Sequence, residues 1–170
     1  FVGLHFKKKF SNGAIVYLVA DAYRGDRMVR CLQDHFNALS GVLKDTLIIN
    51  SDTIGIYGNA DLLAFNGHNG LMDETVFFDK SVDGIARDAV TIACISGDYF
   101  KTRYQATNSY PLVHTTNLLY PGAFILEGVI NSWANLESDK ECKIAAGKGY
   151  YKHKPKSGPN GSQNLFSFGW

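Results

Sequence analysis

The chain has 170 residues, enough to bury a sizeable core, and its length favours one domain. Hydrophobic residues make up 45% and charged residues 19%, which is the balance of a folded protein rather than a disordered one. The formal net charge of +1 gives no support for nucleic-acid or acidic-membrane partners. No apolar run reaches the ~18–20 residues that span a bilayer, so we expect no membrane span.

The sequence begins at Phe1 without the regions of a signal peptide, so we expect a processed chain or one whose native start is missing. Its three cysteines are widely spaced, which fits neither a disulfide framework nor a zinc ribbon. Cys31 lies in a helical pattern and is expected to be a small buried apolar residue. A bridge between Cys31 and Cys142 stays open as an alternative.

The first third of the chain alternates strand-like and helix-like patterns. Residues 1–13 alternate aromatic and basic residues, which favours an edge strand or the end of a longer N-terminal region. Residues 14–23 are apolar on both faces, as expected of a central parallel strand. The spacing of apolar residues predicts an amphipathic helix over 26–39, and Ser40-Gly41 would end it.

The remaining elements continue this alternation. Strands are predicted at 46–49, at Leu62–Asn66, at 89–95 and at 111–115, with a hairpin around 53–57. Helices are predicted at 79–88, at 122–136 and at 141–152, and a helix or turn is predicted at Ser96–Ala106. This order predicts an α/β domain with a mostly parallel sheet over residues 1–153. Residues 154–170 read as a tail whose aromatic end docks back on the domain.

Two of these strands end on residues that can do chemistry. The segment LLAFNGHNG places His68 just beyond one strand, and VTIACIS places Cys94 at the end of another. Ligands bind at the carboxyl ends of parallel strands, so we expect His68 and Cys94 to emerge side by side. A thiol beside an imidazole suits a nucleophile and its base. A structural role for each residue is the competing interpretation.

These two segments, in this order, resemble the caspase, legumain and gingipain group of cysteine peptidases (clan CD). In that group one apolar strand ends in His-Gly and a later strand ends in Ala-Cys. VYLVADAYRG followed by an amphipathic helix is similar to the metacaspase branch, and the block as a whole looks like uncharacterised bacterial caspase-like proteins. The similarity covers roughly residues 14–116. It implies a three-layer caspase-like domain with helices on both faces, a peptide or protein substrate and no cofactor.

The resemblance also implies roles for individual residues. Cys94 would be the nucleophile of an endopeptidase, and His68 would donate a proton to the leaving amine. The backbone N–H groups of Asn69, Gly70 and Cys94 would form the oxyanion hole. The family has glycine directly after the histidine, whereas Asn69 intervenes here, and the spacing from His68 to Cys94 is short for the family.

Two acidic residues are candidates for substrate recognition. Asp21 matches the region in which the family places part of its specificity pocket, and a carboxylate there would favour Lys or Arg before the cleaved bond. A turn or helix N-terminal carboxylate is the alternative for Asp21. Asp98 is the second candidate for recognition of a basic side chain.

Other functions remain as alternatives. His68, Asp73 and His114 are of metal-ligand types, but no HExxH or paired CxxC spacing supports a metal site. The glycines of NGHNG and GIYGN match no phosphate-binding motif. The main alternative to a peptidase is a catalytically idle caspase-like module that binds a peptide or a partner.

Overall fold

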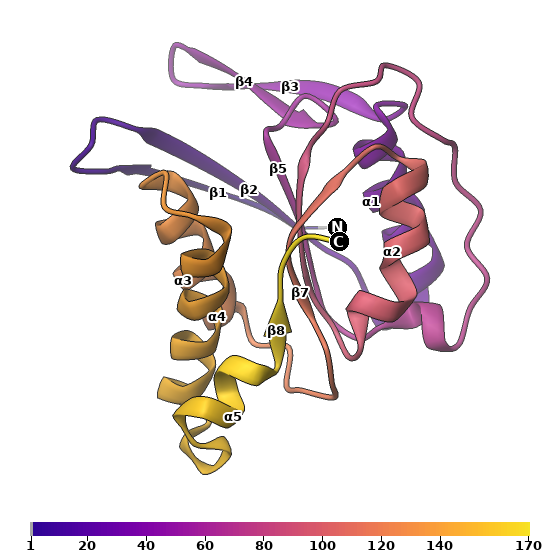
Figure 1. The fold of residues 1–170 in the computed structure, drawn as a ribbon. Coiled ribbons are helices and arrows are strands. Elements are labelled where there is room, and N and C mark those ends of the chain that lie inside the picture. The colour runs from indigo at the N-terminus through magenta and orange to yellow at the C-terminus, as the bar shows by residue number, and fades with distance from the viewer. Residues whose placement is uncertain (1) are drawn as a thin grey trace.

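The computed structural model describes residues 2–170, so Phe1, the first residue of the predicted edge strand, lies outside the described residues. A four-stranded sheet forms the middle of the molecule, with the strand order β5-β6-β7-β8 (Figure 1). Three strands are parallel, and the fourth runs antiparallel at the edge: β5 (Leu62–Asn66), β6 (Asp88–Ile92), β7 (Tyr110–Thr115) and β8 (Phe166–Ser167). The expected α/β class with a mostly parallel sheet is therefore confirmed.

Helices cover both faces of this sheet (Figure 1). One face carries α1 (Met28–Ser40) and α2 (Ser96–Ala106), and the other carries α3 (Ala123–Ala134) and α4 (Asp139–His153). No helix within residues 2–170 combines the length and the apolar character needed to cross a membrane. The shorter helical turns are η1 (Gly25–Arg27), η2 (Gly70–Met72), η3 (Pro155–Ser157) and α5 (Pro159–Asn164).

The central strand β6 is buried on both sides, which explains its uninterrupted apolar run. Ala89 belongs to the apolar cluster beneath α1 and α2, whereas Val90 and Ile92 belong to the cluster beneath α3 and α4. Phe166, from the segment predicted to be a tail, is 1% exposed in the second cluster. Among the aromatic residues of this segment, Phe166 alone is buried, because Phe168 and Trp170 stay 38% and 58% exposed.

Residues 14–23 do not form the predicted central parallel strand. β2 (Ile15–Ala22) pairs instead with β1 (Val2–Lys9) in a separate antiparallel hairpin. The turn between them explains the error, because Gly13 has a φ of 91° that suits a chain reversal. An apolar run does not by itself distinguish a parallel strand from one arm of a hairpin.

A second hairpin precedes the sheet. The predicted strand at 46–49 lies in β3 (Lys44–Ile49), which pairs with β4 (Asp52–Tyr57) and takes no part in the four-stranded sheet. Asn50 occupies the turn with a φ of 57°, a conformation that asparagine tolerates better than most residues.

The predicted helix over 79–88 is absent from the structure. Gly84 has a φ of 68°, and its N–H donates to the Ser81 hydroxyl at 3.1 Å. The N–H of Ile85 donates to the Asp83 carboxylate at 3.0 Å. Short polar side chains that bond nearby N–H groups in this way compete with helix formation. The segment is therefore irregular up to the start of β6.

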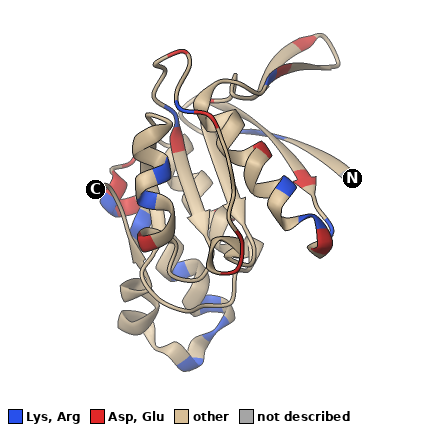
Figure 2. Ribbon diagram, turned by 90° about the vertical axis from the view of Figure 1, so that its right-hand side faces the viewer, with Lys and Arg blue, Asp and Glu red and all other residues tan. Residues whose placement is uncertain are grey.

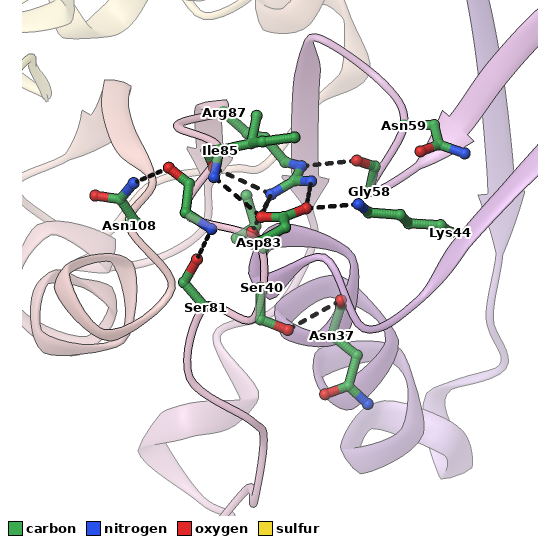
Figure 3. A network of polar contacts seen from close by, with 12 residues as sticks. Asn37, Ser40, Lys44, Gly58, Asn59, Ser81, Asp83, Ile85, Arg87 and Asn108 are labelled. Carbon is green, nitrogen blue, oxygen red and sulfur yellow. Dashed lines mark hydrogen bonds and ion pairs between the residues drawn. The ribbon is translucent and has the colours of Figure 1, made fainter.

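A buried guanidinium holds this irregular segment in place (Figure 3). Arg87 is 2% exposed and donates to both carboxylate oxygens of Asp83, at 3.2 and 2.5 Å. It also donates to the carbonyls of Gly58 at 2.8 Å and Leu39 at 3.0 Å. Lys44 lies 2.6 Å from the same carboxylate. These contacts satisfy a charge whose burial would otherwise be costly.

Loss of this guanidinium is expected to destabilise the fold strongly. Arg87→Met keeps much of the side-chain volume but removes the donor to the carbonyls of Gly58, Leu39 and Ile85, and it leaves Asp83 with only Lys44 and the Ile85 N–H as partners. We expect the free energy of unfolding to fall by ~3–5 kcal/mol in urea titrations followed by circular dichroism. Arg30→Met is the matched control, because Arg30 pairs with Asp34 at the surface and its removal should leave the free energy of unfolding nearly unchanged. Equal effects of the two substitutions would contradict the expectation.

Acid should weaken the same network. Arg87 and Lys44 hold the pKa of the Asp83 carboxyl well below its usual range. A depressed folded-state pKa stabilises the protein above the unfolded value of about 4, and this contribution is lost as the pH falls from there towards the folded value. Urea midpoints between neutral pH and about pH 2.5 should therefore fall less steeply for Asp83→Asn than for the native chain. Asp26→Asn, in an exposed pair, should retain the native slope.

Candidate functional site

The register of β5 and β6 brings the two predicted catalytic positions to one edge of the sheet. Asn66 pairs with Ile92 at the carboxyl ends of the two strands. The N–H of Gly67 donates to the Ile92 carbonyl at 3.1 Å, which extends the ladder by one bond. His68 and Cys94 each lie two residues beyond the last pair, so they leave the sheet at equivalent positions.

Cys94 lies on a sharp turn from β6 into α2. Ile95, the next residue, has a φ of 49° and a ψ of 37°, a left-handed conformation that is unfavourable for a β-branched side chain. Strain of this kind persists only where the surroundings fix it, and it is common at functional sites.

A reciprocal pair of hydroxyl residues fixes this turn. The N–H of Ser96 donates to Thr115 Oγ1 at 3.0 Å, and the N–H of Thr115 donates to Ser96 Oγ at 2.9 Å. The Ser96 hydroxyl donates to the Thr91 carbonyl at 3.0 Å, and the Thr115 hydroxyl donates to the Ala93 carbonyl. Both side chains are fully buried. Sequence reasoning missed this pair, in which Thr115 is the last residue of β7 and Ser96 the first residue of α2.

The thiol of Cys94 is half-buried and donates to a loop carbonyl. Its sulfur lies 3.6 Å from the Leu119 oxygen, on the segment that connects β7 to α3. The imidazole of His68 is exposed and has a different partner: its Nε2 lies 2.6 Å from Asp73 Oδ2. A carboxylate can only accept, so Nε2 carries the proton and Nδ1 is the free basic atom. No hydrogen bond joins His68 to Cys94 among the described residues, although the backbone places them on adjacent strand ends.

Asn69 connects the two strand ends. Its side chain is fully buried, donates from Nδ2 to the Cys94 carbonyl at 2.6 Å and accepts the Leu71 N–H at 3.2 Å. The residue that departs from the family pattern therefore has a structural role. Sequence reasoning named Asn69 only for its backbone, and a polar residue between two glycines gave no signal of this cross-link.

Of the three backbone N–H groups expected to form the oxyanion hole, that of Gly70 already has an acceptor in the protein. The Gly70 N–H already donates to the His68 carbonyl at 3.0 Å, so it is not free to bind an oxyanion. Gly70 packs so closely on Met28 that the turn has no room for a side chain there. Within residues 2–170, the backbone N–H groups of Asn69 and Cys94 have no protein acceptor. These two groups are the remaining donors for an oxyanion.

The two acidic residues named for substrate recognition lie in two different places: Asp21 in β2, and Asp98 four residues beyond Cys94. The carboxylate of Asp21 accepts the Tyr57 hydroxyl at 3.0 Å, and burial together with this bond raises the pKa of Tyr57 to about 12. Asp98 is exposed in the first turn of α2 and lines a cavity of about 220 Å³ with Lys101 and His114. Neither carboxylate has a hydrogen bond or an ion pair with His68 or Cys94, the candidate catalytic dyad, in the described chain.

The alternative metal site has no support from the arrangement of side chains. Within residues 2–170 no three His, Cys, Asp or Glu residues are grouped as metal ligands. His68 and Asp73 contact each other, whereas His114 lines the cavity beside α2. Burial lowers the pKa of His114, and its Nδ1 has no partner in the described structure. The alternative disulfide is wrong, because Cys31 and Cys142 are both free thiols.

Comparisons with models of protein families, with curated proteins and with solved structures found no match. The resemblance to cysteine peptidases therefore depends on the motifs and on the geometry of the two strand ends.

The three thiols should differ in reactivity. Burial raises the pKa of Cys31 to about 11 and also raises that of Cys142, which lowers the thiolate fraction of both near neutral pH. We expect iodoacetamide to modify Cys94 at least about tenfold faster than the other two, as followed by peptide mapping and mass spectrometry. Cys94→Ser should lose the fast phase. Equal labelling of the three cysteines would contradict an accessible reactive thiol at the edge of the sheet.

Proposed function

We propose that this chain is a cysteine endopeptidase with a caspase-like fold, in which Cys94 is the nucleophile and His68 the general acid and base. One observation carries the proposal. The paired register of Asn66 and Ile92 puts a histidine and a cysteine at equivalent positions beyond two neighbouring parallel strands. The sheet covered by helices on both faces supports the caspase-like fold (Figure 1).

The side chains divide the chemistry as follows. Asp73 accepts the Nε2 proton of His68, which leaves Nδ1 to take the proton of the Cys94 thiol. The thiolate attacks the peptide carbonyl, a carbon–sulfur bond forms, and the oxyanion accepts hydrogen bonds from the N–H groups of Asn69 and Cys94. His68 then returns its proton to the amine as the carbon–nitrogen bond breaks. Water then attacks the thioester carbonyl and gives a proton to His68, the carbon–sulfur bond breaks to release the new carboxyl group, and His68 returns the proton to the Cys94 thiolate.

This chemistry requires two side-chain rotations. The Cys94 thiol must leave the Leu119 carbonyl, and the His68 ring must turn Nδ1 towards the sulfur while Asp73 keeps its contact. Hydrogen bonds between catalytic groups are often long or unformed before substrate binds. The strand ends themselves need not move, because Asn69 and the pair formed by Ser96 and Thr115 fix them.

The second candidate function is a caspase-like module that binds peptides without cleaving them. Two contacts favour it: the thiol proton is directed to the Leu119 carbonyl, and the Gly70 N–H is occupied by the His68 carbonyl. Both interpretations place a peptide at the same edge of the sheet. They differ in whether Cys94 is required for turnover or only lines the surface.

Cleavage of a mixed-sequence library of internally quenched peptides tests the proposal. Activity should disappear in Cys94→Ala and fall by about 10²–10⁴-fold in His68→Ala, because the proton transfers are lost. Asp73→Asn should reduce kcat more than it changes KM and should shift the pH profile, because the imidazole loses the acceptor that orients it. Cys31→Ala is the matched control and should retain native turnover. Turnover that survives in Cys94→Ala, or a native chain that binds library peptides without cleaving them, would overturn the proposal.

A further inference from the structure

The segment between β7 and α3, residues 116–122, lies across the ends of both strands that carry the candidate dyad. The Asn66 side chain at the end of β5 donates to the Pro121 carbonyl at 3.0 Å. On the β6 side, the N–H of Ile95 donates to the Asn117 carbonyl at 3.1 Å, and the Cys94 thiol contacts Leu119. A peptide bound at the thiol would therefore lie beside this segment, which we call the 116–122 loop.

Two large apolar side chains of this loop remain exposed on either side of Leu119, whose carbonyl contacts the thiol. Leu119 packs on the second apolar cluster, whereas its neighbours Leu118 and Tyr120 are 62% and 57% exposed. Single exposed apolar residues are ordinary, but these two flank the residue whose carbonyl accepts the hydrogen bond of the thiol. They offer an apolar surface to whatever side chain lies beside the nucleophile.

Tyr120 is also held in place by aromatic neighbours. Its ring stacks on Phe124 at a centroid distance of 6.3 Å, and Phe124 stacks on His153 at 4.1 Å. The backbone N–H of Tyr120 donates to the Tyr150 hydroxyl at 3.4 Å. An apolar surface that is already ordered loses little entropy when a ligand binds, which favours a recognition role.

The charge next to this surface is positive. The ammonium group of Lys154 lies 4.3 Å from the centroid of the Tyr120 ring. Residues 142–170 contain five lysines and no acidic residue. Figure 2 shows blue segments and no red ones at the lowest end of the molecule. This end would attract a carboxylate and repel a basic side chain.

We infer that the 116–122 loop recognises peptides in which a bulky apolar residue is followed by an acidic one. The apolar side chain packs on Leu118 and Tyr120, and the carboxylate pairs with Lys154. This inference rests on the proposed function, which locates the bound peptide at the Cys94 thiol. It adds the class of peptide that would be the substrate. It departs from the basic preference expected from Asp21 and Asp98, since neither has a hydrogen bond or an ion pair with this loop in the described chain.

Four sets of internally quenched peptides test the inference, each with random flanks around a fixed dipeptide: Phe-Glu, Ala-Glu, Phe-Lys or Ala-Lys. For the native chain, kcat/KM should be about tenfold or more higher for Phe-Glu than for Ala-Glu, since a bulky side chain in an apolar subsite discriminates at this level. The advantage of Phe-Glu over Phe-Lys should shrink as salt is added, because exposed charges are screened.

Variants of the loop assign each preference to a side chain. Leu118→Ser and Tyr120→Ser should reduce the preference for Phe-Glu over Ala-Glu, and Lys154→Gln should remove the preference for Glu over Lys. The matched controls are Leu136→Ser, at a side chain that is 88% exposed beyond the far end of α3, and Lys140→Gln in the first turn of α4. Both controls should retain the native preferences, and thermal midpoints confirm that all variants fold.

Binding of the same peptides to Cys94→Ala, measured by fluorescence anisotropy, separates the two proposals. Selective binding of Phe-Glu peptides without turnover by the native chain would overturn the peptidase and support the recognition surface. Turnover with a preference for Phe-Lys, or preferences unchanged in Tyr120→Ser and Lys154→Gln, would overturn the recognition surface and leave the peptidase standing. Neither turnover nor binding would overturn both.

Discussion

The start of the central sheet depends on one buried cation. Arg87 directly precedes β6, and its guanidinium is bonded to Gly58 shortly before β5, to Leu39 near the end of α1 and to Asp83. These partners come from segments that are distant in sequence, so a single side chain sets where two strands begin. The far ends of the same two strands carry Cys94 and His68. A buried ion that is fully hydrogen-bonded in this way costs little in the folded state but a great deal when a partner is removed.

The carboxyl ends of the strands are held by polar contacts rather than by packing alone. Asn69 connects the turn after β5 to the Cys94 carbonyl, and the pair formed by Ser96 and Thr115 connects the turn after β6 to β7. The backbone of both turns is therefore fixed, while the thiol contacts the Leu119 carbonyl and the imidazole contacts Asp73. Catalysis and peptide binding would both use this rigid edge of the sheet. They would differ in whether the proton of the Cys94 thiol moves to His68 or stays on the sulfur that contacts Leu119.

The sequence predicted the α/β class, the strands β5, β6 and β7, the helices α1, α3 and α4, and a helix or turn at α2, because apolar residues recur at the spacing of each element. It did not predict that 14–23 belongs to a hairpin, since pairing partners are set by turns and tertiary contacts. It also predicted a helix where Asp83 and Ser81 bond nearby N–H groups. At the site, residue types and strand ends were enough to name His68 and Cys94. The contacts of Asn69, Thr115 and Leu119 join residues far apart in the chain, so no local pattern reveals them.

The antiparallel strand β8 has a consequence for how the chain is made. Phe166 fills the cluster beneath α3 and α4 and pairs beside Thr115 at the edge of β7. During synthesis, that cluster stays open until residue 166 has left the ribosome, whereas every residue of the cluster beneath α1 and α2 has emerged well before then. The two faces of one sheet would therefore close at different times. An unfinished chain would expose the edge of β7, and such an unpaired edge invites association with other chains.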